Sequence, residues 1–166
     1  AGANGYGNFV MASGTWTYTL DNSASGTDAL DAGDSVTDTY AFPASDSTTQ
    51  TVTVTISGAD DASVWAGTST GSVTEDASAT TATGALTISD VDDSPTITDV
   101  SSTAGANGYG NFVMASGTWT YTIDNSAAAT TALDAGDSVT DTYAFAASDT
   151  NTQTVTITIP GADDKS

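Results

Sequence analysis

Hydrophobic and polar residues alternate strictly along several short stretches of the chain. In residues 15–20 (TWTYTL), Trp16, Tyr18 and Leu20 alternate with threonine, and residues 51–56 (TVTVTI) follow the same pattern. A period of two predicts β-strands with one buried face, and β-branched and aromatic residues favour a pleated, half-buried surface. Gly, Ser, Asp and Asn interrupt every run, and no helical period stands out. The pattern therefore predicts an all-β chain.

The pattern returns 103 residues further along, since Ala1 matches Ala104 and residues 1–63 align without gaps to residues 104–166 with about ten differences. A period near 100 residues fits a whole domain, because helical solenoid repeats span only about 20–50 residues. We therefore expect tandem repeats of 103 residues, with a partial, C-terminal part of a repeat at residues 1–61 and a complete repeat at residues 62–166. Either the segment starts within a domain or a neighbouring chain supplies the missing opening strands.

Seven strands are predicted for the complete repeat, and Ala115-Ser116-Gly117 predicts a short hairpin loop between two of them. The predicted strands cover residues 64–73, 80–89, 96–100, 107–114, 117–124, 138–147 and 152–159. Seven short antiparallel strands in about 100 residues are typical of a two-sheet β-sandwich of the immunoglobulin type.

The charge of the chain excludes several classes of partner. Among 166 residues there are 21 acids and one base, Lys165, which gives a formal net charge of −20. Such a surface repels phosphate, so nucleic acid is excluded as a partner and anionic membranes are disfavoured. No apolar run approaches the roughly 20 residues that span a bilayer, so direct membrane insertion is not expected. Cysteine is absent, which excludes disulfides and thiolate metal sites.

Three ordered motifs carry a resemblance to a known family. The stretches GYGNFVMASGTWTYTIDN, ALDAGDSVTDTYAF and QTVTITIPGADD, preceded by TED at 74–76 and GALTISDVDD at 84–93, resemble the bacterial VCBS repeat, a cadherin-like domain of large surface adhesins. One departure is GADDAS at 58–63, where the family more often has Asn-Asp followed by Ala-Pro. The resemblance implies an extracellular, calcium-dependent extender domain of a bacterial cell-surface protein that acts in cell adhesion.

The predicted topology gathers the acidic residues at the ends of the sandwiches. Several carboxylates close together repel one another unless a cation intervenes, and Ca²⁺ accepts six to eight oxygen ligands with flexible geometry, whereas Mg²⁺ demands a strict octahedron. The simpler interpretation is that these acids only solubilise loops. The first predicted calcium-binding group is Asp38, Asp60 and Asp61 with Asp90, Asp92 and Asp93, and the second is Glu75, Asp76, Asp141, Asp163 and Asp164.

A structural role fits these features better than catalysis. Without His or Cys the common nucleophile–base pairs cannot form, so no enzyme is expected. We expect an extender repeat of an extracellular adhesin or surface fibre whose junctions are stiffened by calcium. Its partners would be neighbouring repeats of the same or an identical chain, and a cell-surface or glycan ligand would be reached through other domains. The alternatives are a filament subunit completed by strand exchange between chains and a sugar- or ice-binding module.

Overall fold

The computed structural model describes residues 1–163, which form two compact units. The first unit comprises Ala1–Ala62 together with Asp90–Asp93, and the second comprises Ser63–Ser89 and the residues from Ser94 onward. The short segment Asp90–Asp93 thus belongs to the first unit, although in the sequence it lies within the second repeat.

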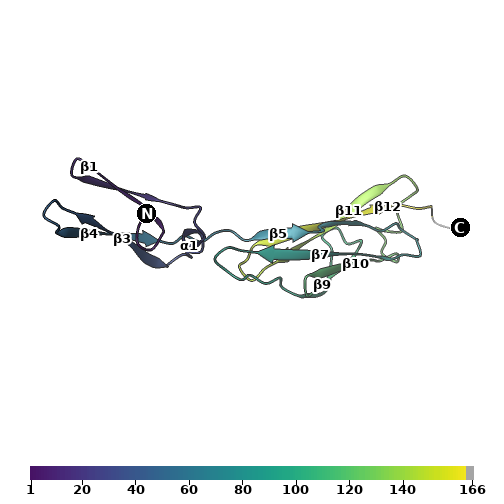
Figure 1. The fold of residues 1–166 in the computed structure, drawn as a ribbon. Helices are drawn as coiled ribbons and strands as arrows, with labels where there is room; N and C mark the ends of the chain where they lie inside the picture. The colour runs from purple at the N-terminus through teal and green to yellow at the C-terminus, as the bar shows by residue number, and fades with distance from the viewer. Residues whose placement is uncertain (164–166) are drawn as a thin grey trace. The chain divides into compact units, whose positions relative to one another are not determined.

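Two hairpins and one helical turn make up the first unit (Figure 1). Strand β1 pairs with β2, and β3 pairs with β4, each antiparallel, so the unit holds two separate two-stranded sheets. The elements are β1 (Gly7–Ala12), β2 (Thr15–Leu20), α1 (Ser25–Asp28), β3 (Ser35–Pro43) and β4 (Thr49–Ser57).

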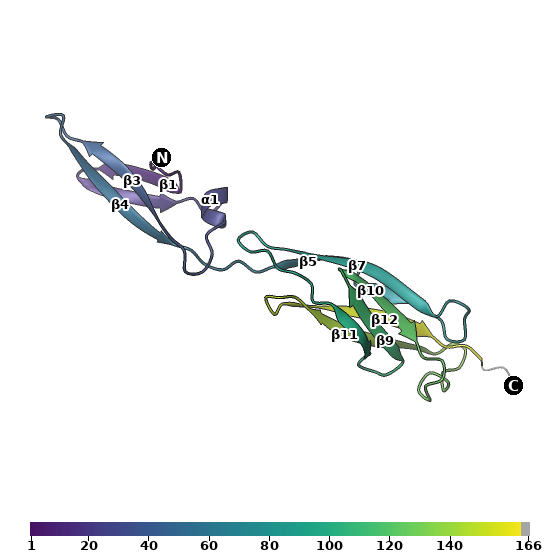
Figure 2. The same ribbon diagram turned by 90° about the horizontal axis from the view of Figure 1, so that it is seen from below.

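The second unit is a sandwich of two sheets, whose layers are visible in Figure 2. One sheet has the strand order β5-β7-β10-β9-β8 and is antiparallel, whereas the other has the order β11-β12-β6, with β6 parallel to β12. Its strands are β5 (Val64–Gly67), β6 (Thr70–Ser72), β7 (Thr81–Ser89), β8 (Val100–Ala104), β9 (Gly110–Ala115), β10 (Thr118–Ile123), β11 (Ser138–Ala146) and β12 (Thr152–Pro160). The prediction of an all-β sandwich is confirmed, although β6 pairs with β12 in parallel where only antiparallel strands were predicted.

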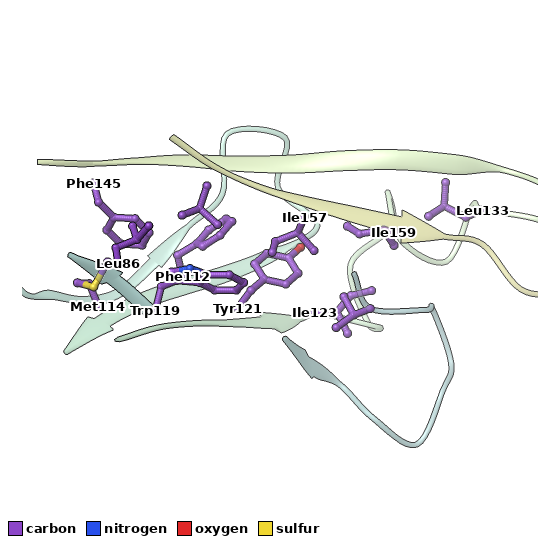
Figure 3. Close-up of a cluster of buried hydrophobic side chains, with 12 residues drawn as sticks. Leu86, Phe112, Met114, Trp119, Tyr121, Ile123, Leu133, Phe145, Ile157 and Ile159 are labelled. Carbon is purple, nitrogen blue, oxygen red and sulfur yellow. The ribbon is translucent and has the colours of Figure 1, made fainter. Parts of the chain in front are cut away.

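The core of the second unit lies between these sheets, and Figure 3 shows Ile157 and Ile159 of β12 pointing toward the aromatic rings of the facing sheet. In β10 the alternation predicted which residues are inward, since Trp119 and Tyr121 are fully buried while Thr118, Thr120 and Thr122 are not. The core cluster consists of Val73, Leu86, Phe112, Met114, Trp119, Tyr121, Ile123, Leu133, Phe145, Val155, Ile157 and Ile159.

The short hairpin loop predicted at Ala115-Ser116-Gly117 is present as a two-residue turn, because β9 extends to Ala115 and β10 begins at Thr118. Ser116 and Gly117 have φ values of 49° and 78°, and two central residues with positive φ match the twist of the flanking strands. Ser13 and Gly14, with φ values of 50° and 80°, make the equivalent turn between β1 and β2.

The prediction of one strand over residues 64–73 is wrong, because the chain changes sheets at Gly67. This residue has φ of 106°, and the next amide, that of Thr68, donates a hydrogen bond of 2.8 Å to the Ala85 carbonyl oxygen. Strand β5 therefore pairs with β7, whereas β6 joins β12 in the other layer. Alternation alone does not reveal this switch, since both halves keep the period of two.

The predicted strand at 96–100 is also wrong, and the one at 107–114 begins too early. The Thr98 amide donates to the Ala146 carbonyl oxygen (2.9 Å), so this segment bonds to the end of β11, and the regular strand β8 starts only at Val100. Residues 107–109 form a turn before β9, in which Gly108 has φ of 77°.

Candidate metal centre

Two loops of the first unit are held together by their backbones. The Gly58 amide donates to the Asp34 carbonyl oxygen (3.0 Å), and the Ala59 amide donates to the Leu30 carbonyl oxygen (3.2 Å). A Cβ atom on Gly58 would collide with the Asp31 carbonyl oxygen, so only glycine allows this approach. The loop before β3 and the loop after β4 are therefore neighbours, which brings Asp31 close to Asp60.

The segment Asp90–Asp93, which is not a β-strand, is a third stretch of backbone beside these two loops. The Asp61 amide donates to Asp92 Oδ2 over 3.0 Å, and the Asp92 amide faces Asp90 Oδ1 at 3.3 Å. These bonds fix the Asp92 carboxylate beside the loop that follows β4. The other carboxylate oxygen, Asp92 Oδ1, is buried and has no hydrogen-bond partner among the described residues.

Asp31, Asp60 and Asp92 converge, with one carboxylate oxygen from each lying within 4.8 Å of the others. Asp31 and Asp92 are half-buried, whereas Asp60 is exposed. Two unit negative charges 4 Å apart repel by about 1 kcal/mol in water and about 4 kcal/mol at the effective dielectric near a protein surface. Oxygens on opposite sides of a Ca²⁺ ion are about 4.6–5.2 Å apart, since each bond is about 2.3–2.6 Å. The three carboxylates can therefore contact one such ion.

The surrounding carboxylates experience the same crowding. Coulombic repulsion, chiefly from Asp31, raises the pKa of Asp93 above its ordinary value. Desolvation raises the pKa of Asp61, and repulsion from Asp92 adds to this effect. Both side chains are exposed, so the repulsion from neighbouring carboxylates persists even where water screens it. The field at this place favours any species that brings positive charge, whether protons or a metal cation.

Of the first predicted group, Asp60 and Asp92 enter the cluster and the structure brings Asp61, Asp90 and Asp93 around it. Asp38 lies elsewhere, in the interior of the unit, with no exposed surface. Its Oδ1 accepts hydrogen bonds of 3.0 Å from the amides of Asn4 and Thr39, and its Oδ2 accepts one of 3.1 Å from the Tyr18 hydroxyl.

These donors determine the ionisation of Asp38. Burial opposes the charged form, but hydrogen bonds from Asn4, Tyr18 and Thr39 outweigh it, so the pKa of Asp38 lies below its ordinary value. Burial, together with the bond to Asp38, raises the pKa of Tyr18 to about 12. Asp38 thus keeps its charge to a lower pH than an ordinary aspartate, and its hydrogen bond from the Asn4 amide ties that loop to β3.

Asp141 repeats this arrangement in the second unit. Its Oδ1 accepts from the amides of Asn107 (2.9 Å) and Thr142 (3.0 Å), and its Oδ2 accepts from the Tyr109 amide and the Tyr121 hydroxyl, both at 3.1 Å. Asp141 is fully buried. Four donors thus occupy both carboxylate oxygens of Asp141. Among the described residues, Asp141 does not belong to a group of converging acidic side chains, although the second predicted group included it.

The remaining members of the second predicted group are only partly brought together. Glu75 is 1% exposed, and its Oε2 accepts a 3.1 Å hydrogen bond from the Ala162 amide, next to Asp163. Asp163 itself faces the Ala135 amide at 3.3 Å, whereas Asp76 is exposed in the turn after Glu75. Asp164 lies outside the described residues.

Asp31 is the residue that the sequence reasoning missed. The available signal was the stretch LDAGD at 30–34, which recurs at 133–137 and precedes a strand in each repeat. In the second repeat Asp134 takes the place of Asp31 and Asp163 the place of Asp60, so two of the three carboxylates recur there. Predicting the contact needs the bond between Gly58 and Asp34, which pairs loops far apart in the sequence.

A family model for the bacterial cadherin-like domain matches residues 60–161. The chain belongs to the bacterial cadherin-like domain family. Bacterial cadherin-like domains are structural and adhesive modules, commonly bind calcium and are typically exposed at the cell surface. No curated protein sequence matches this cadherin-like chain significantly. Within residues 1–163, no helix has the length and apolar character that crossing a bilayer requires.

Proposed function

We propose that this chain is an extender module of an extracellular bacterial adhesin or surface fibre, in which calcium stiffens the array. The observation that carries the proposal is the convergence of Asp31, Asp60 and Asp92 in a member of a family that commonly binds calcium. The repeated sequence supports an array, and the narrower resemblance to VCBS repeats is part of the same proposal. The work of such a module is mechanical rather than catalytic.

A cation at this cluster would act on both units through the connectivity of the chain. Asp31 and Asp60 are held by the loops of the first unit, whereas Asp92 lies on a segment flanked by Ser89 and Ser94, which both belong to the second unit. Binding these three carboxylates to one ion would restrict the movement of one unit against the other. In repeat proteins such neighbour interactions add to the stability of each unit.

Calcium suits this donor set better than magnesium. Carboxylate oxygens are hard ligands that both ions accept, but Mg²⁺ requires near-ideal octahedral geometry and gives up its waters reluctantly. Ca²⁺ tolerates irregular sets, and extracellular modules bind it with dissociation constants of about 10⁻⁴–10⁻³ M. We expect this range for a site in which Asp60 is exposed.

The first test measures calcium binding by isothermal titration calorimetry. Asp31→Asn or Asp92→Asn should weaken binding by at least about tenfold, because each removes one of three charged ligands. Asp149→Asn is the matched control: it makes the same change in charge in an exposed turn of the second unit and retains the oxygen that accepts from the Asn151 amide. Equal losses in all three variants would contradict the site.

The second test asks whether binding stiffens the chain. Small-angle X-ray scattering of the chain should show a narrower distribution of interatomic distances within the molecule with calcium than with chelator. Asp92→Asn should give the chelated profile in both conditions, whereas Asp149→Asn should respond like the unaltered chain. Calcium binding without any change in scattering would retain the site and reject the stiffening role.

A further inference from the structure

Both repeats contain an asparagine that is followed by a glycine. Asn107 precedes Gly108 in the stretch GANGYG at 105–110, and the same stretch recurs at 2–7. Such a pair is chemically labile, because glycine has no Cβ atom that would keep its backbone nitrogen away from the asparagine carboxamide. Asn107 and Gly108 are both exposed. Solvent therefore reaches a reactive pair in the turn that precedes β9.

The backbone around this pair encloses the buried carboxylate of Asp141. The amides of Asn107 and Tyr109 donate hydrogen bonds of 2.9 and 3.1 Å to its two oxygens, and a Cβ atom on Gly105 would collide with it. Because Asp141 belongs to β11, these contacts tie the turn before β9 to the facing sheet. We call residues 105–110 together with Asp141 the Asp141 latch.

The latch also holds the two groups that would react with each other. The Asn107 carboxamide donates a 2.7 Å hydrogen bond from Nδ2 to the Thr140 carbonyl oxygen of β11. The Gly108 amide donates a 3.2 Å hydrogen bond to the Gly105 carbonyl oxygen. Attack of the Gly108 nitrogen on the Asn107 carboxamide carbon requires that both bonds break. The closed latch therefore protects the pair, and only an open latch permits the reaction.

The first unit repeats these contacts. Asn4 donates from Nδ2 to the Thr37 carbonyl oxygen over 2.7 Å and from its amide to the buried Asp38 over 3.0 Å. A Cβ atom on Gly2 would collide with the Asp38 carboxylate. The latch is therefore a property of the repeated sequence, and the first unit offers a second copy in which to test it.

We propose that Asn107 is a site of spontaneous deamidation, which the closed Asp141 latch prevents and the open latch permits, and that Asn4 is the equivalent site of the first unit. In the open latch the Gly108 nitrogen forms a bond to Asn107 Cγ, its proton passes through water to Nδ2, and Nδ2 leaves as ammonia. Water then adds to one of the two carbonyl carbons of the resulting succinimide and opens the ring. Aspartate or isoaspartate takes the place of Asn107, so one amide and one water have become one carboxylic acid and ammonia.

The product would keep the latch from closing again. A carboxylate in place of the Asn107 carboxamide has no donor for the Thr140 carbonyl oxygen, and it adds a negative charge near the Asp141 carboxylate. Isoaspartate also lengthens the backbone by one carbon between the two amides that donate to Asp141. The reaction thus converts a transient opening of the latch into a permanent one.

The first test compares deamidation of the complete chain in buffer and in urea at slightly alkaline pH, with chelator present so that the calcium site has no influence. Because only the open fraction of a folded protein reacts, Asn107 should convert at least about tenfold more slowly in the folded chain than in urea. Peptide mapping by mass spectrometry, with heavy-oxygen water as the solvent, measures the conversion, since each succinimide takes up one solvent oxygen when it opens. Equal rates in the two conditions would overturn the proposal.

Variants separate opening of the latch from unfolding of the whole unit, at a temperature at which circular dichroism shows every variant folded. Asp141→Asn should raise the rate at Asn107 at least about threefold, because fewer hydrogen bonds hold the latch closed, and leave the rate at Asn4 unchanged. Asp38→Asn should act on Asn4 alone. Gly67→Ala alters the second unit away from the latch, so it should leave the rate at Asn107 unchanged. Equal acceleration by Gly67→Ala and Asp141→Asn would overturn the proposal, because unfolding of the whole unit would then control the reaction.

The effect of the product is tested with Asn107→Asp in the complete chain. This variant should lower the melting temperature of the second unit by about 4–8 °C, the shift expected for one lost hydrogen bond in a domain of about 100 residues. Asn111→Asp is the matched control, because it adds the same charge at an exposed position of β9 and should leave the melting temperature unchanged. Equal melting temperatures of the two variants would overturn the conclusion that deamidation keeps the latch open.

Discussion

Asp141 and Asp92 carry the same carboxylate but have very different neighbours. Four N–H and O–H donors surround Asp141 in the interior, whereas Asp92 accepts one amide hydrogen bond and has other carboxylates nearby. Hydrogen-bond donors around a buried carboxylate offset the cost of its burial. A carboxylate whose neighbours are also acids gains from a cation. At the residue scale, the number of donors decides which acids hold the fold and which are available to a metal.

We predict that Asp141→Asn destabilises the second unit. The amide nitrogen of asparagine would face a donor, either the Asn107 and Thr142 amides or the Tyr109 amide and Tyr121 hydroxyl. An unsatisfied buried donor costs about 1–3 kcal/mol, and about 1 kcal/mol lowers the melting temperature of a domain of 60–100 residues by about 4–8 °C. Thermal unfolding followed by circular dichroism measures this effect. An unchanged melting temperature in the variant, as expected for Asp149→Asn, would contradict it.

Asp38 should make the first unit sensitive to acid. The folded pKa of Asp38 lies below its ordinary value, which is about 3.9 for an unfolded chain. Its stabilising effect is therefore complete above the unfolded pKa and is lost as the pH falls through the folded pKa. In Asp38→Asn the loss of stability between pH 5 and pH 2 should be smaller than in the unaltered chain. The measurement is urea unfolding at several pH values. The signal of Trp16 is obtained by subtracting the fluorescence of a Trp16→Phe variant from that of the same chain with Trp16.

At the scale of elements, the alternation of residues predicted which side of the strands is buried in the second unit, but not which sheet every strand joins. In the first unit the alternating Trp16 and Leu20 are 44% and 37% exposed. Trp119 and Ile157 are inward as the pattern requires, because burial and the period of two are both local properties. The change of sheet at Gly67 depends on a hydrogen bond from Thr68 to Ala85, 17 residues away. The same limit applied to the carboxylate cluster, since Asp31 reaches Asp60 only through paired loops, and to Asp38, whose internal donors have no sequence signature.

Two glycines allow the change of sheet to be tested. Gly67 and Gly136 have nearly equal φ values, 106° and 104°, but a Cβ atom on Gly67 would collide with the Ala85 carbonyl oxygen, whereas one on Gly136 has open space. Gly136→Ala should cost about 1–2 kcal/mol from the left-handed backbone alone, and Gly67→Ala should cost clearly more. Urea unfolding compares the free energies. Equal costs would mean that the contact with Ala85 has no effect.

At the scale of the whole molecule, negative charge is the dominant property. A formal net charge of −20 destabilises any compact arrangement by self-repulsion, and the raised pKa values of Asp61 and Asp93 show where the repulsion concentrates. The composition predicts that cations stabilise the compact chain, and the tandem sequence predicts acids near the ends of the repeats. Which three of the many carboxylates converge could not be predicted from the sequence, because it depends on how the loops pair in the folded chain.

Protons should compete with calcium at the cluster. Because repulsion raises the pKa of Asp93 and Asp61 in the absence of a cation, calcium binding should release protons and weaken steadily as the pH falls from 7 through the carboxylate range. Titration calorimetry in two buffers with different ionisation enthalpies, at pH 5 and pH 7, measures the protons released. Identical apparent enthalpies in both buffers at pH 5 would contradict the linkage, and Asp149→Asn should behave like the unaltered chain.

The parallel pairing of β6 with β12 has a consequence for the response of the second unit to tension. These strands are the second and the last of that unit, and their register joins Thr70 to Thr156 and Ser72 to Thr158. Pulling the unit by its two ends would draw the strands in opposite directions along their length. Their bonds would then be loaded in shear and would have to rupture together, whereas a peeled hairpin opens one bond at a time. The unit should therefore resist stretching more strongly than its thermal stability alone indicates.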